Sequence, residues 1–320
     1  MKRLRAVWIG GFTLACGAQP VAGPTAPRPV APGPVPASTE CVEAPGAVTQ
    51  DEIRPLTEPL AFYEDRSRAH PNDRAALVDL LRAYEREGRW GYAAAVAWRL
   101  TQYAPDNADY QHRRALNLMR VLQATHDRVR VGEMQEPLDK CIELDPKFAD
   151  CHFLLGEVAL WSDDEELAEE RYRRAIELDP RRAAYYQRLA ELYAAYRQDR
   201  AAAAVLSEAL RFAPVKGEHA QARFPLLILL ADLTAKGDDP PSALRYLEQA
   251  EPLATAGPAP LAYELAAAYA NTDPPRNSQV QEKVVTFMKR FYEAACRGDS
   301  AVNYREQCLR ASLWVMGYAQ

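Results

Sequence analysis

Four prolines that follow apolar, helix-like segments recur at a nearly constant spacing, and this recurrence constrains the fold more than any other feature. They are Pro105, Pro146, Pro180 and Pro214, separated by 41, 34 and 34 residues. Between them Ala, Leu, Glu and Arg dominate, and no segment alternates apolar and polar residues for long, which is typical of helices rather than strands. Because proline cannot donate to the preceding helical turn, each one ends a helix. A fixed period of this kind indicates an array of helical units.

The units at 149–182 and 183–214 carry small and large apolar residues at matching positions. In the first unit these are Leu155, Gly156, Ala168, Tyr172 and Ala175, and in the second Leu189, Ala190, Tyr193, Ala202, Leu206 and Ala209. The small residues let two helices approach closely, and the large ones fill the space between neighbouring hairpins. One such hairpin cannot bury its apolar faces alone, so neighbouring hairpins must stack.

A 34-residue period that ends in proline, with these residues at these positions, resembles the tetratricopeptide repeat, a helix-turn-helix unit. The resemblance implies an all-α fold, a right-handed superhelical solenoid of helix hairpins over residues 55–320. Weaker copies are expected at 74–105, 106–146, 217–253 and 259–297, followed by a capping helix at 300–317. The unit that ends at Pro146 has seven extra residues, which we place where its first helix lengthens.

The N-terminus is typical of an export signal, because the positive segment MKRLR precedes the short apolar stretch AVWIGGFTLA. This stretch is too short to span a bilayer as a stable helix. The following TLAC resembles the lipobox of bacterial lipoproteins, although Thr13 replaces the usual leucine. The resemblance implies a signal peptide over 1–15 and a lipidated Cys16, which would anchor the chain in a membrane. The alternative is ordinary cleavage nearby, for instance after Ala18, which would give a secreted or periplasmic protein.

Two further features bear on where the exported chain lies. Gly17 stands where lipoproteins retained in the inner membrane carry aspartate, and this favours the outer membrane, with the chain facing the periplasm. Residues 16–50 then contain eight prolines among Ala, Gly and Val. Such a composition forms neither helix nor sheet and favours extended polyproline II. We therefore expect a disordered, Pro-rich tether that spaces the helical domain from the membrane.

Five cysteines remain beyond Cys16, and an oxidising compartment would allow them to form disulfides. In the repeat register, Cys141 and Cys151 face each other across a repeat boundary, and Cys296 and Cys308 flank the turn before the last helix. We expect both pairs to be disulfides; the alternative is buried free thiols. Because the number is odd, Cys41 in the tether is left over and is available for an intermolecular bond.

The sequence contains no catalytic or nucleotide-binding motif, so we expect neither an enzyme nor a bound cofactor or metal. Its histidines are His70, His112, His126, His152 and His219. None belongs to an HExxH motif or a close Cys-His cluster, although His112 and His152 lie in the first helices of successive repeats. The acidic run from Ser162 is the composition of a helix start, and the RGD at 297–299 is three common residues in a row. The net charge of -5 argues against nucleic acid as a partner.

In the tetratricopeptide fold, the first helix of each hairpin lines a concave face, which the resemblance implies is a binding groove. By the register above, the expected groove residues are Asp79, Arg82, Arg86, His112, Arg113, Arg120, Phe153, Glu157, Leu160, Gln187, Glu191 and Ala194. This set changes from basic to acidic along the stack, with an apolar step at Phe153. Such a groove suits an extended or helical peptide bound by mixed contacts; the alternative is a solvated face with no single ligand.

One ligand of this family is disfavoured. The subfamily that reads a peptide carboxylate uses Lys and Asn at set positions of the first helices. Here those positions hold Val78, Arg82, His112, Leu116, Phe153, Glu157, Gln187 and Glu191.

The sequence therefore predicts a non-enzymatic, membrane-anchored adaptor that binds an envelope protein or peptide. The resemblance to tetratricopeptide lipoproteins implies a role in assembling a pilus, motility, secretion or outer-membrane machine. One alternative is a self-associating structural lipoprotein. Another is an enzyme accessory whose site lies after residue 215, which would require convergent carboxylates in a pocket.

Overall fold

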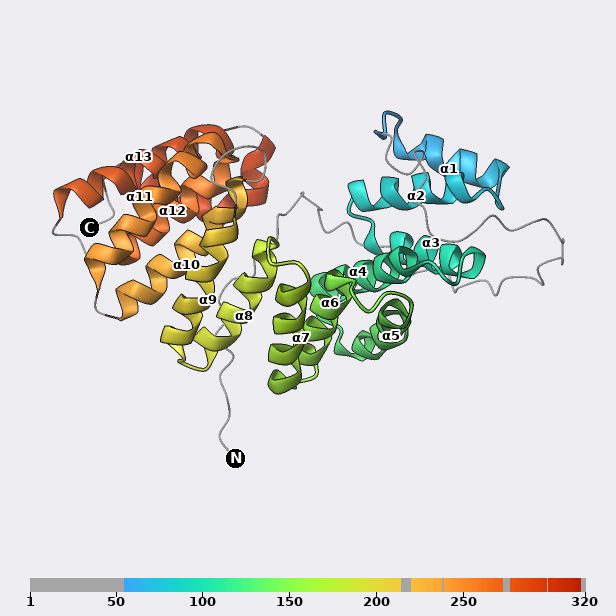
Figure 1. The fold of residues 1–320 in the computed structure, drawn as a ribbon. Helices are drawn as coiled ribbons and strands as arrows, with labels where there is room; N and C mark the ends of the chain where they lie inside the picture. Colours follow the sequence, from blue (N-terminus) through green and yellow to red (C-terminus); the bar gives the residue numbers. More distant parts are fainter. Residues whose placement is uncertain (1–54, 214–219, 238, 273–276, 298, 318–320) are drawn as a thin grey trace. The chain divides into compact units, whose positions relative to one another are not determined.

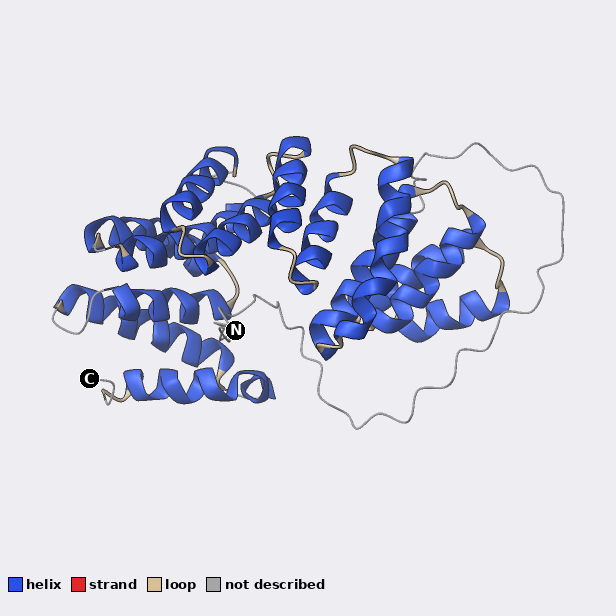
Figure 2. Cartoon of the chain, turned by 90° about the horizontal axis from the view of Figure 1, so that it is seen from below, coloured by secondary structure: helices blue, strands red, loops and turns tan. Residues whose placement is uncertain are grey.

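The computed structural model describes residues 55–213, 220–237, 239–272, 277–297 and 299–317 (Figure 1). Within these ranges every regular element is a helix (Figure 2). The expected signal peptide, Cys16, the tether and Cys41 lie outside the described residues, as do Pro214 and His219. The chain divides into two compact units, Met1–Asp163 and Asp164–Gln320, and each is described by itself.

The first unit contains two complete helix hairpins, flanked by one further helix on each side. Its elements are α1 (Leu60–Ala69), α2 (Arg74–Arg86), α3 (Trp90–Tyr103), α4 (Ala108–Thr125), the 3-10 helix η2 (Arg128–Met134), α5 (Gln135–Leu144) and α6 (Ala149–Trp161). Helix α2 packs on α3, and α4 packs on η2 and α5. The seven extra residues of this repeat extend α4 to 18 residues and add η2 before α5.

The second unit contains three hairpins, preceded by one helix and closed by another. Its elements are α7 (Glu165–Leu178), α8 (Ala183–Ala195), α9 (Asp199–Phe212), η3 (Ala220–Ala222), α10 (Arg223–Lys236), α11 (Pro240–Ala256), α12 (Ala259–Thr272), α13 (Ser278–Ala295), η4 (Asp299–Tyr304) and α14 (Arg305–Val315). The hairpins are α8–α9, α10–α11 and α12–α13, and α14 packs on α13.

Side-chain caps fix where several of these helices begin. Asp164 Oδ1 accepts from the backbone N–H of Leu167 at 3.1 Å, so the acidic run from Ser162 does start a helix. Asp239 accepts from the N–H of Ser242, and Pro240 and Pro241 occupy the first helical positions of α11, where their missing N–H groups cost nothing. Asn107 caps α4 in the same way.

Two of the hairpin turns contain a left-handed residue at the same position of the repeat. Gly88, between α2 and α3, has φ of 68°, and Arg197, between α8 and α9, has φ of 60°. Asp163, at the corresponding position after α6, also has φ of 60°. Glycine adopts this conformation without steric cost, whereas Asp and Arg do not. The left-handed turn therefore forms at these positions even where the sequence lacks glycine.

The core of each unit is built from the repeated small and large apolar positions. In the second unit a buried Leu-Ala pair recurs in each first helix, as Leu189–Ala190, Leu230–Ala231 and Leu265–Ala266. Alanines of the second helices are also buried, among them Ala202, Ala243 and Ala250. In the part of the chain that the structure describes, no helix combines the length and the apolar character needed to span a bilayer.

Candidate functional site

The first helices of the three hairpins in the second unit form a continuous row, because α10 contacts both α8 and α12. On each of these helices the buried Leu-Ala pair marks the side that packs into the core. The residue two positions before each pair and the residue directly after it are half-buried and so remain partly accessible. These residues, which we call the first-helix face of the second unit, are Gln187, Glu191, Ile228, Asp232, Tyr263 and Ala267.

This first-helix face is acidic at one end and apolar at the other. On α8, Glu191 accepts hydrogen bonds from Gln187 Nε2 at 2.9 Å and from Arg188 Nη1 at 2.6 Å, so both of its oxygens have partners. On α10, Asp232 pairs with Lys236 one turn away, next to the half-buried Ile228. On α12, the Tyr263 ring packs at 5.1 Å from that of Phe291. The face therefore changes from polar on α8 through mixed on α10 to apolar on α12, and such a surface suits a peptide with both polar and apolar residues.

Glu264 lies beside this face, and sequence reasoning missed it. Its Oε2 is buried and has no hydrogen-bond partner. Burial raises the pKa of this carboxyl group to about 7, because a low-dielectric environment disfavours the charged form. No motif singles out one glutamate among many on a helix, so its burial was not foreseeable from the sequence.

The first helices of the first unit are joined by a polar network on Glu85 of α2. Glu85 accepts from Arg113 Nη1 at 3.0 Å and from Asn117 Nδ2 at 2.8 Å, both on α4. Arg113 also donates through Nε to Asp109 at 2.8 Å. The expected groove residue Arg113 therefore holds two repeats together, so its charge is already compensated within the unit.

Two of the expected groove residues are not on an accessible surface. Asp79 is only 2% exposed, and its carboxylate accepts from Arg66 Nη1 of α1 at 2.6 Å. Glu157 is only 4% exposed. These placements correct the expectation that both line a groove: α1 packs on α2 ahead of the first expected repeat, and it supplies the cation that lets Asp79 be buried.

The remaining expected residues keep some exposure, but they do not form one described groove. Arg86 and Arg120 are exposed, and Arg82, His112, Phe153 and Leu160 are half-buried. Arg86 donates to the carbonyls of Leu56 and Glu58, and the Arg120 guanidinium lies 5.9 Å from the Trp90 ring centroid. Gln187, Glu191 and Ala194 belong to the second unit, so each unit has to be considered as a separate binding surface.

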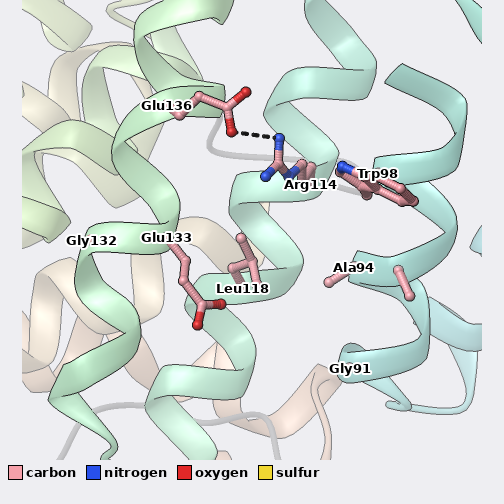
Figure 3. Close-up of a pocket in the computed structure, with 9 residues that line it drawn as sticks. Gly91, Ala94, Trp98, Arg114, Leu118, Gly132, Glu133 and Glu136 are labelled. Carbon is pink, nitrogen blue, oxygen red and sulfur yellow. Dashed lines mark ion pairs between the residues drawn. The ribbon is translucent and has the colours of Figure 1, made fainter. Parts of the chain in front are cut away.

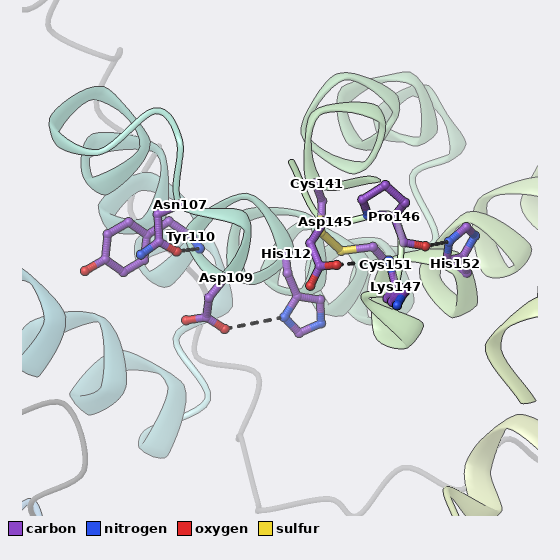
Figure 4. The surroundings of a disulfide bond; sticks show 10 residues. All are labelled: Asn107, Asp109, Tyr110, His112, Cys141, Asp145, Pro146, Lys147, Cys151 and His152. Carbon is purple, nitrogen blue, oxygen red and sulfur yellow. Dashed lines mark hydrogen bonds and ion pairs between the residues drawn. A yellow bond between two sulfur atoms is a disulfide. The ribbon is translucent and has the colours of Figure 1, made fainter. Parts of the chain in front are cut away.

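The structure forms both of the disulfides that the sequence predicts. Cys141 of α5 is bonded to Cys151 of α6, with the Cα atoms 6.4 Å apart (Figure 4). Cys296, at the end of α13, is bonded to Cys308 of α14, with the Cα atoms 5.5 Å apart. Each bond closes a short loop between consecutive helices and restrains how they pack.

The two histidines near the first disulfide have separate partners. His112 Nδ1 lies 4.0 Å from Asp109 Oδ1, and its ring packs 5.0 Å from that of Phe148. His152 Nε2 lies 3.1 Å from the carbonyl oxygen of Pro146 (Figure 4). Among the described residues, no group of three or more His, Cys, Asp or Glu side chains is placed to hold a metal ion.

Comparison with known proteins identifies the fold through structure rather than sequence. No protein-family model and no curated protein matches the chain. Yeast Tom70 aligns over 81% of this chain and 58% of its own, with 13% identity and a TM-score of 0.54. A tetratricopeptide repeat protein from Parabacteroides merdae aligns over 79% of this chain and 91% of its own, with 12% identity and a TM-score of 0.53. The chain therefore has the tetratricopeptide-repeat fold that its proline period indicates.

A third solved structure, the tetratricopeptide repeat protein TTC0263 of Thermus thermophilus, aligns over 53% of this chain and 88% of its own, with 21% identity and a TM-score of 0.46. At these identities the similarity concerns the fold alone.

Proposed function

We propose that this chain is a membrane-anchored adaptor that binds a partner protein or peptide of the bacterial envelope and has no catalytic activity of its own. The observation that carries the proposal is the first-helix face of the second unit. Three successive helices there present accessible side chains at the same two positions of each repeat. A row of this kind offers an extended segment repeated contacts at regular intervals.

The chemistry of the face supports a mixed ligand rather than a peptide carboxylate. Glu191 and Asp232 are both acidic, and Ile228 and Tyr263 add partly buried apolar surface. The cations beside this face, Arg188 and Lys236, are already paired with Glu191 and Asp232, so neither pair offers an uncompensated positive charge to a carboxylate terminus. A segment that combines polar and apolar residues suits the face better.

Export to an oxidising compartment is the second part of the proposal. Two disulfides in the described residues support it, since such bonds persist mainly outside the reducing cytoplasm. The lipobox-like TLAC, with Cys16 as the acylated residue, supplies the anchor, and the Pro-rich segment supplies the spacing. We place the protein at the outer membrane facing the periplasm, in the assembly of an envelope machine such as a pilus, motility, secretion or outer-membrane assembly complex.

The binding face is tested by quantitative co-purification after crosslinking in living cells. We expect the triple variant Gln187→Ala/Glu191→Ala/Asp232→Ala to lose an envelope protein that the wild type enriches. The matched control is Ser207→Ala/Glu208→Ala/Gln249→Ala, which changes exposed residues on the second helices α9 and α11. If both triple variants retain the same proteins as the wild type, this face is not the binding site.

The anchor is tested separately by cell fractionation and intact-mass measurement. We expect the wild-type chain to start at Cys16 and to carry the mass of acyl groups in the membrane fraction. Cys16→Ser should release it from the membrane. A wild-type chain that is soluble and unmodified would contradict the anchor without affecting the binding face.

Self-association is a second candidate function, favoured by the outer side of α14. Leu309 and Leu313 are exposed one turn apart on α14, and Met316, the residue that caps its C-terminus, is exposed as well. Exposed apolar side chains at helical spacing suit contact with a second copy of the chain. Light scattering with and without reductant tests it. A dimer that Leu309→Glu/Leu313→Glu dissociates would support self-association, and a monomer under both conditions would exclude it.

A further inference from the structure

A pocket of about 420 Å³ lies in the first unit between α3, α4, η2 and α5 (Figure 3). Helix α3 contributes one wall, η2 and the start of α5 the other, and α4 the floor. The lining residues are Gly91, Ala94, Ala95, Trp98, Arg114, Leu118, Gly132, Glu133 and Glu136. Its size is within the range of pockets that bind small ligands or single side chains.

The extra residues of the second repeat create this pocket. The 41-residue spacing between Pro105 and Pro146 makes room for η2, which buries Val131 and Met134 against the core and leaves Gly132 and Glu133 at the surface. On the opposite wall, α3 presents only small residues until Trp98. A Cβ atom at Gly91 or Gly132 would meet nothing within 4 Å, so both glycines face open space.

The charges of the pocket are unequally exposed. The Arg114 side chain is 17% exposed, and its Nη1 pairs with Glu136 Oε2 at 2.9 Å, whereas the Glu136 side chain is 73% exposed (Figure 3). Glu133 is exposed on the same wall, where its Oε2 lies 3.6 Å from Arg130 Nη1 in an exposed ion pair, and the indole of Trp98 is exposed opposite. Exposed ion pairs contribute little, so both carboxylates stay accessible to a ligand. The lining residues themselves carry a net charge of -1, and their carboxylates are their most accessible charged groups.

We propose that this pocket binds an arginine or lysine side chain of a partner segment in which an apolar residue adjoins the basic one. The aliphatic part of the basic side chain would lie over Leu118 and Ala94. Its charged end would pair with Glu133 and Glu136, and the Trp98 ring offers a cation–π contact. An acidic side chain would meet two carboxylates, and the two cations beside them, Arg114 and Arg130, are already paired with those carboxylates. This site goes beyond the proposed function, because it lies on helices of the first unit rather than on α8, α10 and α12 and would bind a different segment of a partner.

The proposal is tested with the full chain and a phage-displayed library of random heptapeptides. Peptides are selected on the wild type and counter-selected on Gly91→Leu. Gly91 is at an exposed helical position, and the leucine side chain would extend into the pocket. Because a Cβ atom at this position meets no other atom within 4 Å, the variant should fold normally. We expect the selected peptides to contain Arg or Lys next to an apolar residue.

The affinities of synthetic copies of the selected peptides for charge variants of the chain then show whether the pocket carboxylates contribute to binding. We expect Glu133→Gln/Glu136→Gln to weaken binding at least tenfold. The control Asp139→Asn/Glu143→Gln, which removes two exposed carboxylates of α5 outside the pocket, should leave it unchanged. Peptides that are acidic or lack a basic residue, equal binding to the Gln variant, or no selected peptide at all would overturn the proposal. The Gln187/Glu191/Asp232 alanine variant should bind these peptides normally, which distinguishes this site from the first-helix face.

Discussion

Tyr269 on α12 donates a 2.6 Å hydrogen bond through Oη to Glu251 on α11, and so joins two consecutive hairpins. Glu251 also pairs with Lys283 of α13 at 2.8 Å. The same relationship recurs twice within the units. Tyr193 of α8 donates to Glu169 of α7 at 2.7 Å, and Tyr84 of α2 donates to Glu64 of α1 at 3.0 Å. In each of these repeats a tyrosine near the end of the first helix therefore donates a hydrogen bond to a glutamate of the preceding helix.

Removing this bond should weaken the second unit. We expect Tyr269→Phe to lower the free energy of unfolding by about 1–2 kcal/mol, because Glu251 loses a donor in a partly buried position. Urea unfolding followed by circular dichroism measures the loss. Tyr246→Phe on α11 removes a hydroxyl for which the structure records no hydrogen bond, and it should change stability little. Equal stability of the two variants would show that the Tyr269–Glu251 bond is not stabilising.

Glu264 should make stability depend on pH. Burial raises the pKa of Glu264 from the usual 4.5 to about 7. The contribution of the neutral carboxyl group to the free energy of unfolding is therefore fully present below pH 4.5, and it is lost as the pH rises through 7 and the buried group becomes charged. Glu264→Gln, which stays neutral, should therefore be about 1–3 kcal/mol more stable than the wild type at pH 8 and similar to it at pH 4.

Unfolding free energies measured across this pH range provide the test. Glu282→Gln, on the exposed side of α13, is the charge-matched control. A Glu264 variant whose stability follows the wild type at every pH would mean that the carboxylate is solvated in the folded protein.

The disulfides should contribute stability through loop closure. Cys141→Ala/Cys151→Ala removes a link between residues 10 apart, and Cys296→Ala/Cys308→Ala removes one between residues 12 apart. Each double variant should lose about 2–3 kcal/mol, since the unfolded chain regains the entropy of an open loop. Thermal unfolding in the oxidised state measures this loss. Reductant should lower the thermal unfolding midpoint of the wild type and leave unchanged that of the variant in which all four cysteines are alanine. An equal decrease in both proteins would show that the effect of reductant does not come from these two disulfides.

The left-handed turn residue Arg197 is a site for stabilisation. At φ of 60° an arginine is strained, and glycine is not. Arg197→Gly should raise the free energy of unfolding by about 0.5–1 kcal/mol, after allowing for the greater entropy of glycine in the unfolded chain. Arg200→Gly, on the exposed side of α9 just beyond the turn, should instead destabilise by about 1 kcal/mol. Chemical denaturation that moves both variants in the same direction would contradict this account of the turn.

The fold was predictable because the residues that specify each hairpin are close together in the sequence and recur from one copy to the next. Prolines at a 34-residue period close the two clearest copies, small residues such as Ala190 have counterparts in Ala231 and Ala266, and each hairpin packs mainly on its sequence neighbours. The disulfide pairs followed from the same register. Individual burial was not predictable in this way. Asp79 is buried because Arg66 reaches it from α1, a helix ahead of the first expected repeat.

The same limit applies to the pocket and to Glu264. The length of the second repeat shows that residues are inserted, but their composition does not show that they form η2 or that Gly132 faces open space. These features depend on how several helices pack against one another in space, which the spacing of residues along the sequence does not show. The signal peptide, Cys16 and the tether lie outside the described residues and stay predictions.

The most direct test of the adaptor proposal is site-specific photo-crosslinking in living cells. A photoreactive residue is placed at Gln187 or Asp232 on the first-helix face, and at Ser207 or Gln249 on the second helices as controls. We predict that one envelope protein is crosslinked from both first-helix positions and from neither control position. Crosslinks that are absent at Gln187 and Asp232, or equally strong at Ser207 and Gln249, would contradict the proposal that this face holds a partner.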